Sequence, residues 1–117
     1  MKDLGNLLAR AGFAVAMGML ASVGAAPARA DCFEDIGCTD SDYFDVDDLV
    51  ELSCENLWYV RNRIYDENGF CFRTARAREA FDNSDCWVNN QSKVQMSQTE
   101  RHNVNEIVEA ESENGCN

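Results

Sequence analysis

Apolar side chains recur at the spacing of an α-helix over residues 54–67. At 100° per residue, one face of this helix carries Cys54, Leu57, Trp58, Val60, Ile64 and Tyr65. Ser53 is a suitable N-cap, and Asn68-Gly69 is a typical C-terminal stop. The pattern therefore predicts a long helix from Cys54 to about Glu67.

A second helical pattern begins after residue 96. Ser97 and Glu100 have the S-x-x-E spacing of a capping box, and Gly115 follows the last periodic position. The apolar line of this segment is Val104, Ile107 and Val108. We therefore expect a helix from Ser97 to about Glu113.

Two shorter helices complete the expected elements. One covers Asp45 to Leu52, where Asp45 can cap and Asp47 and Asp48 fall in the first turn, which favours acidic side chains. The other runs from Thr74, its cap, to Phe81. Residues 31–44 are polar and suggest an irregular segment. Residues 83–95 suggest a loop with a strand-like piece at Trp87-Val88.

The fold expected from these elements is mainly α, a small domain of three to four short helices with loop segments. Its apolar side chains are few, and we expect them to form one core cluster. The predicted members are Leu49, Leu52, Leu57, Trp58, Val60, Ile64, Tyr65, Phe70, Phe72, Phe81, Val104, Ile107 and Val108.

The first thirty residues differ from the rest. Lys2 and Arg10 flank a polar start, an uncharged Ala- and Gly-rich run follows, and Pro27-Ala28-Arg29-Ala30 has an A-x-A cleavage pattern. The alternative, a retained membrane anchor, requires about 20 strongly apolar residues. We therefore predict a Sec signal peptide cleaved between Ala30 and Asp31, a polar segment at 31–44 and a helical domain at 45–117.

Removing residues 1–30 makes the chain more acidic. The whole chain has 10 basic and 21 acidic residues, and the segment holds Lys2, Arg10 and Arg29 against Asp3. Seven basic and 20 acidic side chains remain, for a net charge of −13. Such a charge opposes binding to nucleic acid or anionic lipid, and it permits a cationic partner.

The six cysteines form an even set in a short, exported chain, which favours disulfides. They are Cys32, Cys38, Cys54, Cys71, Cys86 and Cys116. Zinc is the alternative, but no C-x-x-C pair is present and His102 is the only histidine. We expect no metal or other cofactor.

Helix geometry narrows the 15 pairings that six cysteines allow. A continuous helix from Cys54 to Glu67 rises about 20 Å, and four residues return at most about 14 Å, so Cys54 should not pair with Cys71. If the two long helices are antiparallel, Cys54 lies near Cys116. Cys71–Cys86 and Cys32–Cys38 would then complete the set.

Between Leu52 and Cys116 the chain has a characteristic series of residues, which includes Leu57, Trp58, Arg61, Asn62, Ile64, Tyr65, Gly69, Phe70, Phe72, Phe81, Glu100, Asn103, Ile107 and Glu111. With this series the chain resembles the YARHG domain, a small bacterial extracytoplasmic module. The motif that names the family reads Tyr65-Asp66-Glu67-Asn68-Gly69 here, so its arginine and histidine are missing. The resemblance implies an exported bacterial domain and supplies no mechanism.

Arg61 falls in the middle of the apolar face of its helix. A guanidinium in such a place needs hydrogen-bonding partners. Glu111 lies just as unexpectedly on the apolar line of the last helix, one turn after Ile107. We expect a bidentate Arg61–Glu111 ion pair that joins the two helices. The functional alternative is an anion-binding pocket around Arg61 and Asn62.

Other groups give weaker signals. Asp40, Asp42 and Glu51 match positions 1, 3 and 12 of an EF-hand loop, but Phe44 and Asp45 occupy positions 5 and 6, so calcium is a minor alternative. His102 is expected to be exposed. The last helix ends in an acidic cluster, formed by Glu106, Glu109, Glu111 and Glu113, that could face a cationic partner.

These observations favour a non-catalytic binding or structural module of the bacterial cell envelope. Its partner would be a cationic envelope protein or a cell-wall component. One alternative is a small envelope hydrolase that acts on peptidoglycan or glycans with paired carboxylates. Another is an inhibitor of a cationic secreted enzyme. The sequence does not indicate an oligomeric state.

Overall fold

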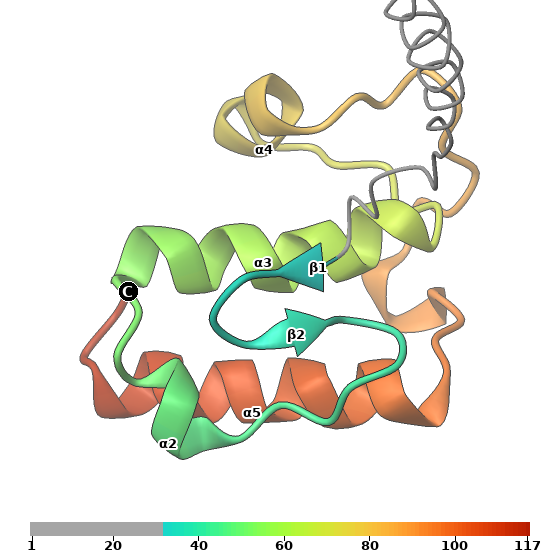
Figure 1. Cartoon of the computed structure of the whole chain (residues 1–117). Helices are drawn as coiled ribbons and strands as arrows, with labels where there is room; N and C mark the ends of the chain where they lie inside the picture. Colours follow the sequence, from blue (N-terminus) through green and yellow to red (C-terminus); the bar gives the residue numbers. More distant parts are fainter. Residues whose placement is uncertain (1–31) are drawn as a thin grey trace, which may run out of the picture. The chain divides into compact units, whose positions relative to one another are not determined.

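A computed structural model describes residues 32–117 (Figure 1). The predicted signal peptide and its cleavage point lie outside the described residues. The elements, in order, are β1 (Cys32–Phe33), β2 (Gly37–Cys38), α2 (Val46–Leu49), α3 (Cys54–Glu67), α4 (Ala75–Ala80), the 3₁₀ helix η1 (Gln91–Lys93) and α5 (Gln98–Glu113). The domain is mainly α, as predicted.

Helices α3 and α5 lie side by side and run antiparallel (Figure 1). Their facing stripes supply most of the larger hydrophobic cluster, whose buried members are Phe44, Leu49, Leu57, Val60, Ile64, Val104, Ile107 and Ala110. Full burial of a Leu or Ile side chain stabilises a fold by about 1.5–3 kcal/mol. The other segments of the larger cluster pack against this pair of helices.

The ends of the helices are set by the caps that the sequence predicts. The side chains of Ser53, Thr74 and Ser97 each accept a backbone N–H three residues further on. Glu100 completes a capping box with Ser97. Asp45 caps α2, although this helix covers only Val46–Leu49 and is shorter than expected because a turn follows it.

The segment before α2 is more ordered than predicted. β1 and β2 form an antiparallel hairpin, and Thr39 and Phe44 are buried. Asn103 of α5 is fully buried and holds this segment: its Oδ1 accepts the Phe44 N–H at 2.7 Å, and its Nδ2 donates to the carbonyls of Thr39 and Asp42. These long-range bonds order a segment with no periodic pattern of its own.

The apolar interior forms two clusters, so the prediction of one is wrong. The second consists of Phe72, Ala77 and Phe81, with aromatic side chains of α3 packed against it. Phe81 stacks on Phe72 and on Tyr59, with ring centroids 5.1 Å apart in both pairs. Val108 was also predicted in the core but is 50% exposed, because the inward positions of this helix are Val104, Ile107 and Ala110.

Three disulfides link the described cysteines, and they are the pairs favoured by helix geometry. Cys54–Cys116 joins the start of α3 to the residue after Gly115, beyond the end of α5. Cys71–Cys86 closes the segment that contains α4, and Cys32–Cys38 closes the hairpin. One disulfide therefore stabilises each of three regions: the hairpin, the segment that contains α4, and the pair of long helices.

The chain turns sharply at Gly69, directly after α3. Gly69 has φ +88°, and a Cβ there would lie 2.4 Å from the Trp87 ring, so both the backbone and the space require glycine. The Gly69 carbonyl accepts the N–H groups of Trp87 and Val88, and Phe70 forms a parallel bridge with Val88. This bridge is the strand-like piece expected at Trp87-Val88.

Candidate functional site

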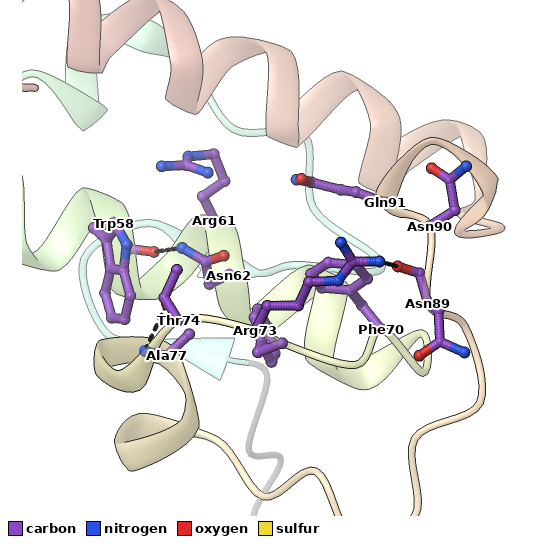
Figure 2. A pocket seen from close by; sticks show the side chains of 11 residues that line it. Trp58, Arg61, Asn62, Phe70, Arg73, Thr74, Ala77, Asn89, Asn90 and Gln91 are labelled. Atoms are coloured by element: carbon purple, nitrogen blue, oxygen red, sulfur yellow. Dashed lines mark hydrogen bonds between the residues drawn. The ribbon is translucent and has the colours of Figure 1, made fainter.

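A hollow lies between α3 and the segments on either side of α4 (Figure 2). Its volume is about 600 Å³. We call it the arginine groove, and it is lined by Trp58, Arg61, Asn62, Phe70, Phe72, Arg73, Thr74, Ala77, Asn89, Asn90 and Gln91. Of these described lining residues none is acidic, in a chain with twice as many acidic as basic side chains.

Arg61 forms the wall of the groove nearest α5. Its Nε donates to Oε1 of Glu111 at 2.8 Å, and its Nη2 donates to Oε2 at 3.1 Å. The side chains are 24% and 14% exposed, respectively, so the ion pair is largely but not fully shielded from water. The predicted Arg61–Glu111 pair is therefore present, and the paired Arg61 also lines the groove next to Asn62.

Arg73 and the amide side chains form the opposite part of the groove. Arg73 is exposed, and one of its terminal nitrogens donates to the Asn89 carbonyl at 3.2 Å (Figure 2). Asn90 caps the 3₁₀ helix η1 through its Oδ1, and Gln91 is the first residue of η1. The loop at 89–91 thus presents three consecutive amide side chains next to a guanidinium.

Trp58 borders the groove with one ring face already occupied. The Arg76 guanidinium carbon lies 3.7 Å from the Trp58 ring centroid, a cation–π contact. Glu55 accepts a hydrogen bond from the same guanidinium at 2.6 Å. That ring face is therefore closed to a ligand that would stack on it.

Asn62 is the most deeply placed polar residue of the groove. It is 8% exposed, and its Nδ2 donates to the Trp58 carbonyl at 2.9 Å. Figure 2 shows the amide oxygen turned away from that bond and toward the open space. Because it has no hydrogen-bond donor among the described residues, Oδ1 is an acceptor presented to the groove.

A second, smaller hollow has the opposite charge. We call it the Trp87 hollow, and its volume is about 320 Å³. It is lined by Asp66, Glu67, Gly69, Asp82, Asp85, Cys86 and Trp87. Trp87 is 70% exposed. The hollow includes Asp66 and Glu67 of the motif in which this chain lacks the family's arginine.

Two carboxyl groups of the Trp87 hollow have pKa values displaced in opposite directions. Burial raises the pKa of Asp66; Arg63 opposes this effect, and the charges of Asp85 and Asp82 add to it. The backbone N–H and the hydroxyl of Ser84 donate to Asp82 and lower its pKa. Oppositely shifted carboxyl groups are a feature of acid–base sites.

The four acidic residues near the end of α5 make different contacts. Glu111 binds Arg61, and Glu106 accepts the Val46 N–H at 3.0 Å. Glu109 and Glu113 are exposed and remain as surface charge. Only part of the predicted cluster is therefore free to face a partner.

The residues with EF-hand spacing do not act together in the structure. Asp42 accepts the Cys38 N–H at 2.7 Å, and Glu51 is in the turn after α2. Across residues 32–117, no group of three or more His, Cys, Asp or Glu side chains is arranged to hold a metal ion.

His102 is not an exposed surface residue, so that prediction is wrong. It is half-buried, and its Nε2 lies 3.0 Å from the Phe44 carbonyl oxygen. Its ring also packs edge-on against Tyr43, with centroids 4.9 Å apart. The N-terminal segment folds over the helix face that the sequence suggests is open, so His102 has a structural contact.

Sequence reasoning placed Arg61 and Asn62 in a candidate pocket and missed the remaining polar wall. Arg73, Asn89, Asn90 and Gln91 come from loop segments with no periodicity. Their position depends on the Cys71–Cys86 disulfide and on the bridge at Phe70 and Val88. A cluster of three consecutive amides was the one available signal.

The comparisons with known proteins identify the domain. The sequence model of the YARHG domain matches residues 35–112, which begin between β1 and β2 and extend to the last turn of α5. No curated protein and no solved structure matches the chain. Among the described residues no helix is long and apolar enough to span a bilayer, and the three disulfides are typical of an oxidising compartment. The chain therefore belongs to the YARHG domain family, a family of extracytoplasmic domains.

Proposed function

We propose that the protein is a non-catalytic binding module of the bacterial cell envelope and that the arginine groove is its binding site. One observation carries the proposal. The arginine groove presents guanidinium and amide groups, and no carboxylate is among its described lining residues. Such a lining can hold a ligand by hydrogen bonds, and it lacks the acid–base pair that hydrolysis requires.

The hydroxyl groups near the groove and on the helices support a binding role. Thr74 lines the groove, but its Oγ1 accepts the Ala77 N–H at 3.2 Å and caps α4. Ser53 and Ser97 cap α3 and α5 in the same way. A hydroxyl nucleophile requires an adjacent base, whereas these hydroxyls serve as structural acceptors.

The family resemblance coincides with the groove. Five residues that carry the resemblance line it: Trp58, Arg61, Asn62, Phe70 and Phe72. The proposal includes export through the Sec signal at residues 1–30, with cleavage after Ala30. Export would place the domain where its disulfides form and where envelope ligands are present.

A hydrolase remains the second candidate, and the Trp87 hollow favours it. Asp66 would act as the acid with a raised pKa, and Asp82 would be the ionised partner. Asp82 is fully exposed, however, and glycosidase acids work in sheltered clefts. The same acidic hollow, with Trp87 at its rim, would suit a cationic partner, including a cationic enzyme that the protein inhibits.

Co-sedimentation with isolated cell envelopes tests the proposal. The full chain is exported, and the protein is recovered from the periplasm as wild type, Arg73→Glu or the matched control Arg101→Glu, which changes an exposed arginine outside the groove. We expect envelopes to retain the wild type and the control but not Arg73→Glu, without release of soluble glycan or peptide fragments. Equal retention of all three would overturn the groove, and fragment release abolished by Asp66→Asn would establish the hydrolase.

A further inference from the structure

Building on the proposed binding role, we propose that the arginine groove recognises a peptide that carries a carboxylate. The acceptor oxygen of Asn62 and the guanidinium of Arg73 face the same hollow. A peptide can donate a backbone N–H to the Asn62 oxygen and can place a carboxylate on the Arg73 guanidinium. This proposal defines the chemical class of the ligand, which the binding role leaves open.

The anionic part of the ligand is assigned to Arg73. Its side chain is exposed and makes one hydrogen bond, from a terminal nitrogen to the Asn89 carbonyl. A guanidinium has five N–H donors in a planar fork, so the remaining donors can bind both oxygens of a carboxylate. Arg61 is not assigned this role, because Glu111 already binds two of its nitrogens and compensates its charge.

The amide part of the ligand is assigned to Asn62 and the 89–91 loop. Asn62 is 92% buried, and the acceptor oxygen of its amide has no donor from the described residues. This oxygen keeps access to solvent, so a ligand N–H can reach it from the groove. The amides of Asn89 and Gln91 supply both donors and acceptors, which match the alternating N–H and C=O groups of a peptide backbone.

A glycan fits the same lining less well. Sugar rings commonly bind on the open face of an exposed aromatic side chain. Arg76 covers one face of Trp58, and Phe70 and Phe72 are engaged in edge-on contact with each other at 5.0 Å between centroids. The groove therefore offers polar partners rather than a free aromatic platform.

Nuclear magnetic resonance titration of the exported, labelled protein tests the ligand class. The probes are acetyl-Ala-Ala-Ala with a free C-terminal carboxylate, the same tripeptide with a C-terminal amide, and the sugar trimer chitotriose. We expect the carboxylate peptide to shift the side-chain signals of Asn62 and Arg73. We expect Arg73→Ala to weaken this peptide about tenfold or more, the loss typical of a charged hydrogen bond. Arg101→Ala serves as the control, with affinity unchanged.

The arms of the titration separate failure of the ligand class from failure of the binding role. Chitotriose shifts at Asn62 without peptide shifts would overturn the peptide proposal and leave the groove as a binding site. Equal affinity for the carboxylate and amide forms would overturn the assignment of a carboxylate to Arg73. No shift at the groove with any of the three probes, together with equal envelope retention of Arg73→Glu and wild type, would overturn both.

Discussion

Arg61 and Glu111 join the two long helices through two parallel hydrogen bonds of 2.8 and 3.1 Å. Each residue comes from the apolar face of its helix, and each supplies the partner that the other requires. The pair is partly shielded, so its hydrogen bonds are stronger than those of an exposed ion pair. It also fixes one wall of the arginine groove to the frame of the domain.

Glu111→Gln should therefore destabilise the protein. The substitution removes one charge and one acceptor from the pair, and we expect the free energy of unfolding to fall by about 1.5–3 kcal/mol. For a domain of this size the melting temperature would drop by roughly 10 °C. Glu109→Gln is the control, because Glu109 is exposed on the same helix. Thermal melts in which the two variants coincide would rule out an energetic role for the pair.

Asn103→Ala should loosen the N-terminal segment. The fully buried amide makes three hydrogen bonds to the backbone of residues 39–44, and its removal leaves three backbone groups without partners. We expect a loss of about 3 kcal/mol in urea unfolding and faster hydrogen exchange at the Phe44 amide. The exposed Asn105 provides a matched Asn105→Ala control on the same helix. Unchanged protection of Phe44 would contradict this role.

The three disulfides should contribute unequally to stability. Cys54–Cys116 spans 62 residues, and Cys32–Cys38 spans six. In the chain-entropy description, the longer loop stabilises by about 4 kcal/mol and the shorter by about 2 kcal/mol. Paired serine substitutions at each bridge, measured by chemical denaturation, should show this order. The reverse order would show that loop closure does not govern their contribution.

Asp66→Asn should stabilise the protein at neutral pH. Because the folded-state pKa of Asp66 lies above its ordinary value of 3.8, the ionised carboxylate is disfavoured in the folded protein at pH 7. As the pH falls below both pKa values, the carboxyl is protonated in both states and the penalty disappears. At pH 7 the free energy of unfolding of the variant should exceed that of the wild type. Near pH 3 the two free energies should become nearly equal. A difference that grows toward acid pH would reverse the assignment.

Much of the frame could be predicted from the sequence because local signals agree there. Ser53, Thr74 and Ser97 cap helices where the pattern places them. The sequence tied an antiparallel packing of α3 and α5 to a Cys54–Cys116 disulfide as a condition, and the structure contains both. Arg61 and Glu111 were identifiable because a charge on an apolar stripe requires a partner.

The parts that sequence analysis missed depend on long-range contacts. Residues 38–44 are ordered by Asn103, about 60 positions away, and no local pattern encodes that bond. The second cluster includes aromatic stacking between Tyr59 and Phe81, which lie 22 positions apart in the sequence. The polar wall of the groove is built from loops, where side-chain direction has no period.

Oxidative footprinting of the exported protein on isolated envelopes tests the central claim most directly. The claim is that binding occurs in the arginine groove. Trp58 and Phe70 line the groove, whereas Tyr43 and Trp87 are 60% and 70% exposed outside it. Mass spectrometry should show reduced oxidation of Trp58 and Phe70 in the bound protein, with Tyr43 and Trp87 oxidised as in the free protein. Protection of Trp87 with unchanged oxidation of Trp58 and Phe70 would contradict the account and move the binding surface to the acidic Trp87 hollow.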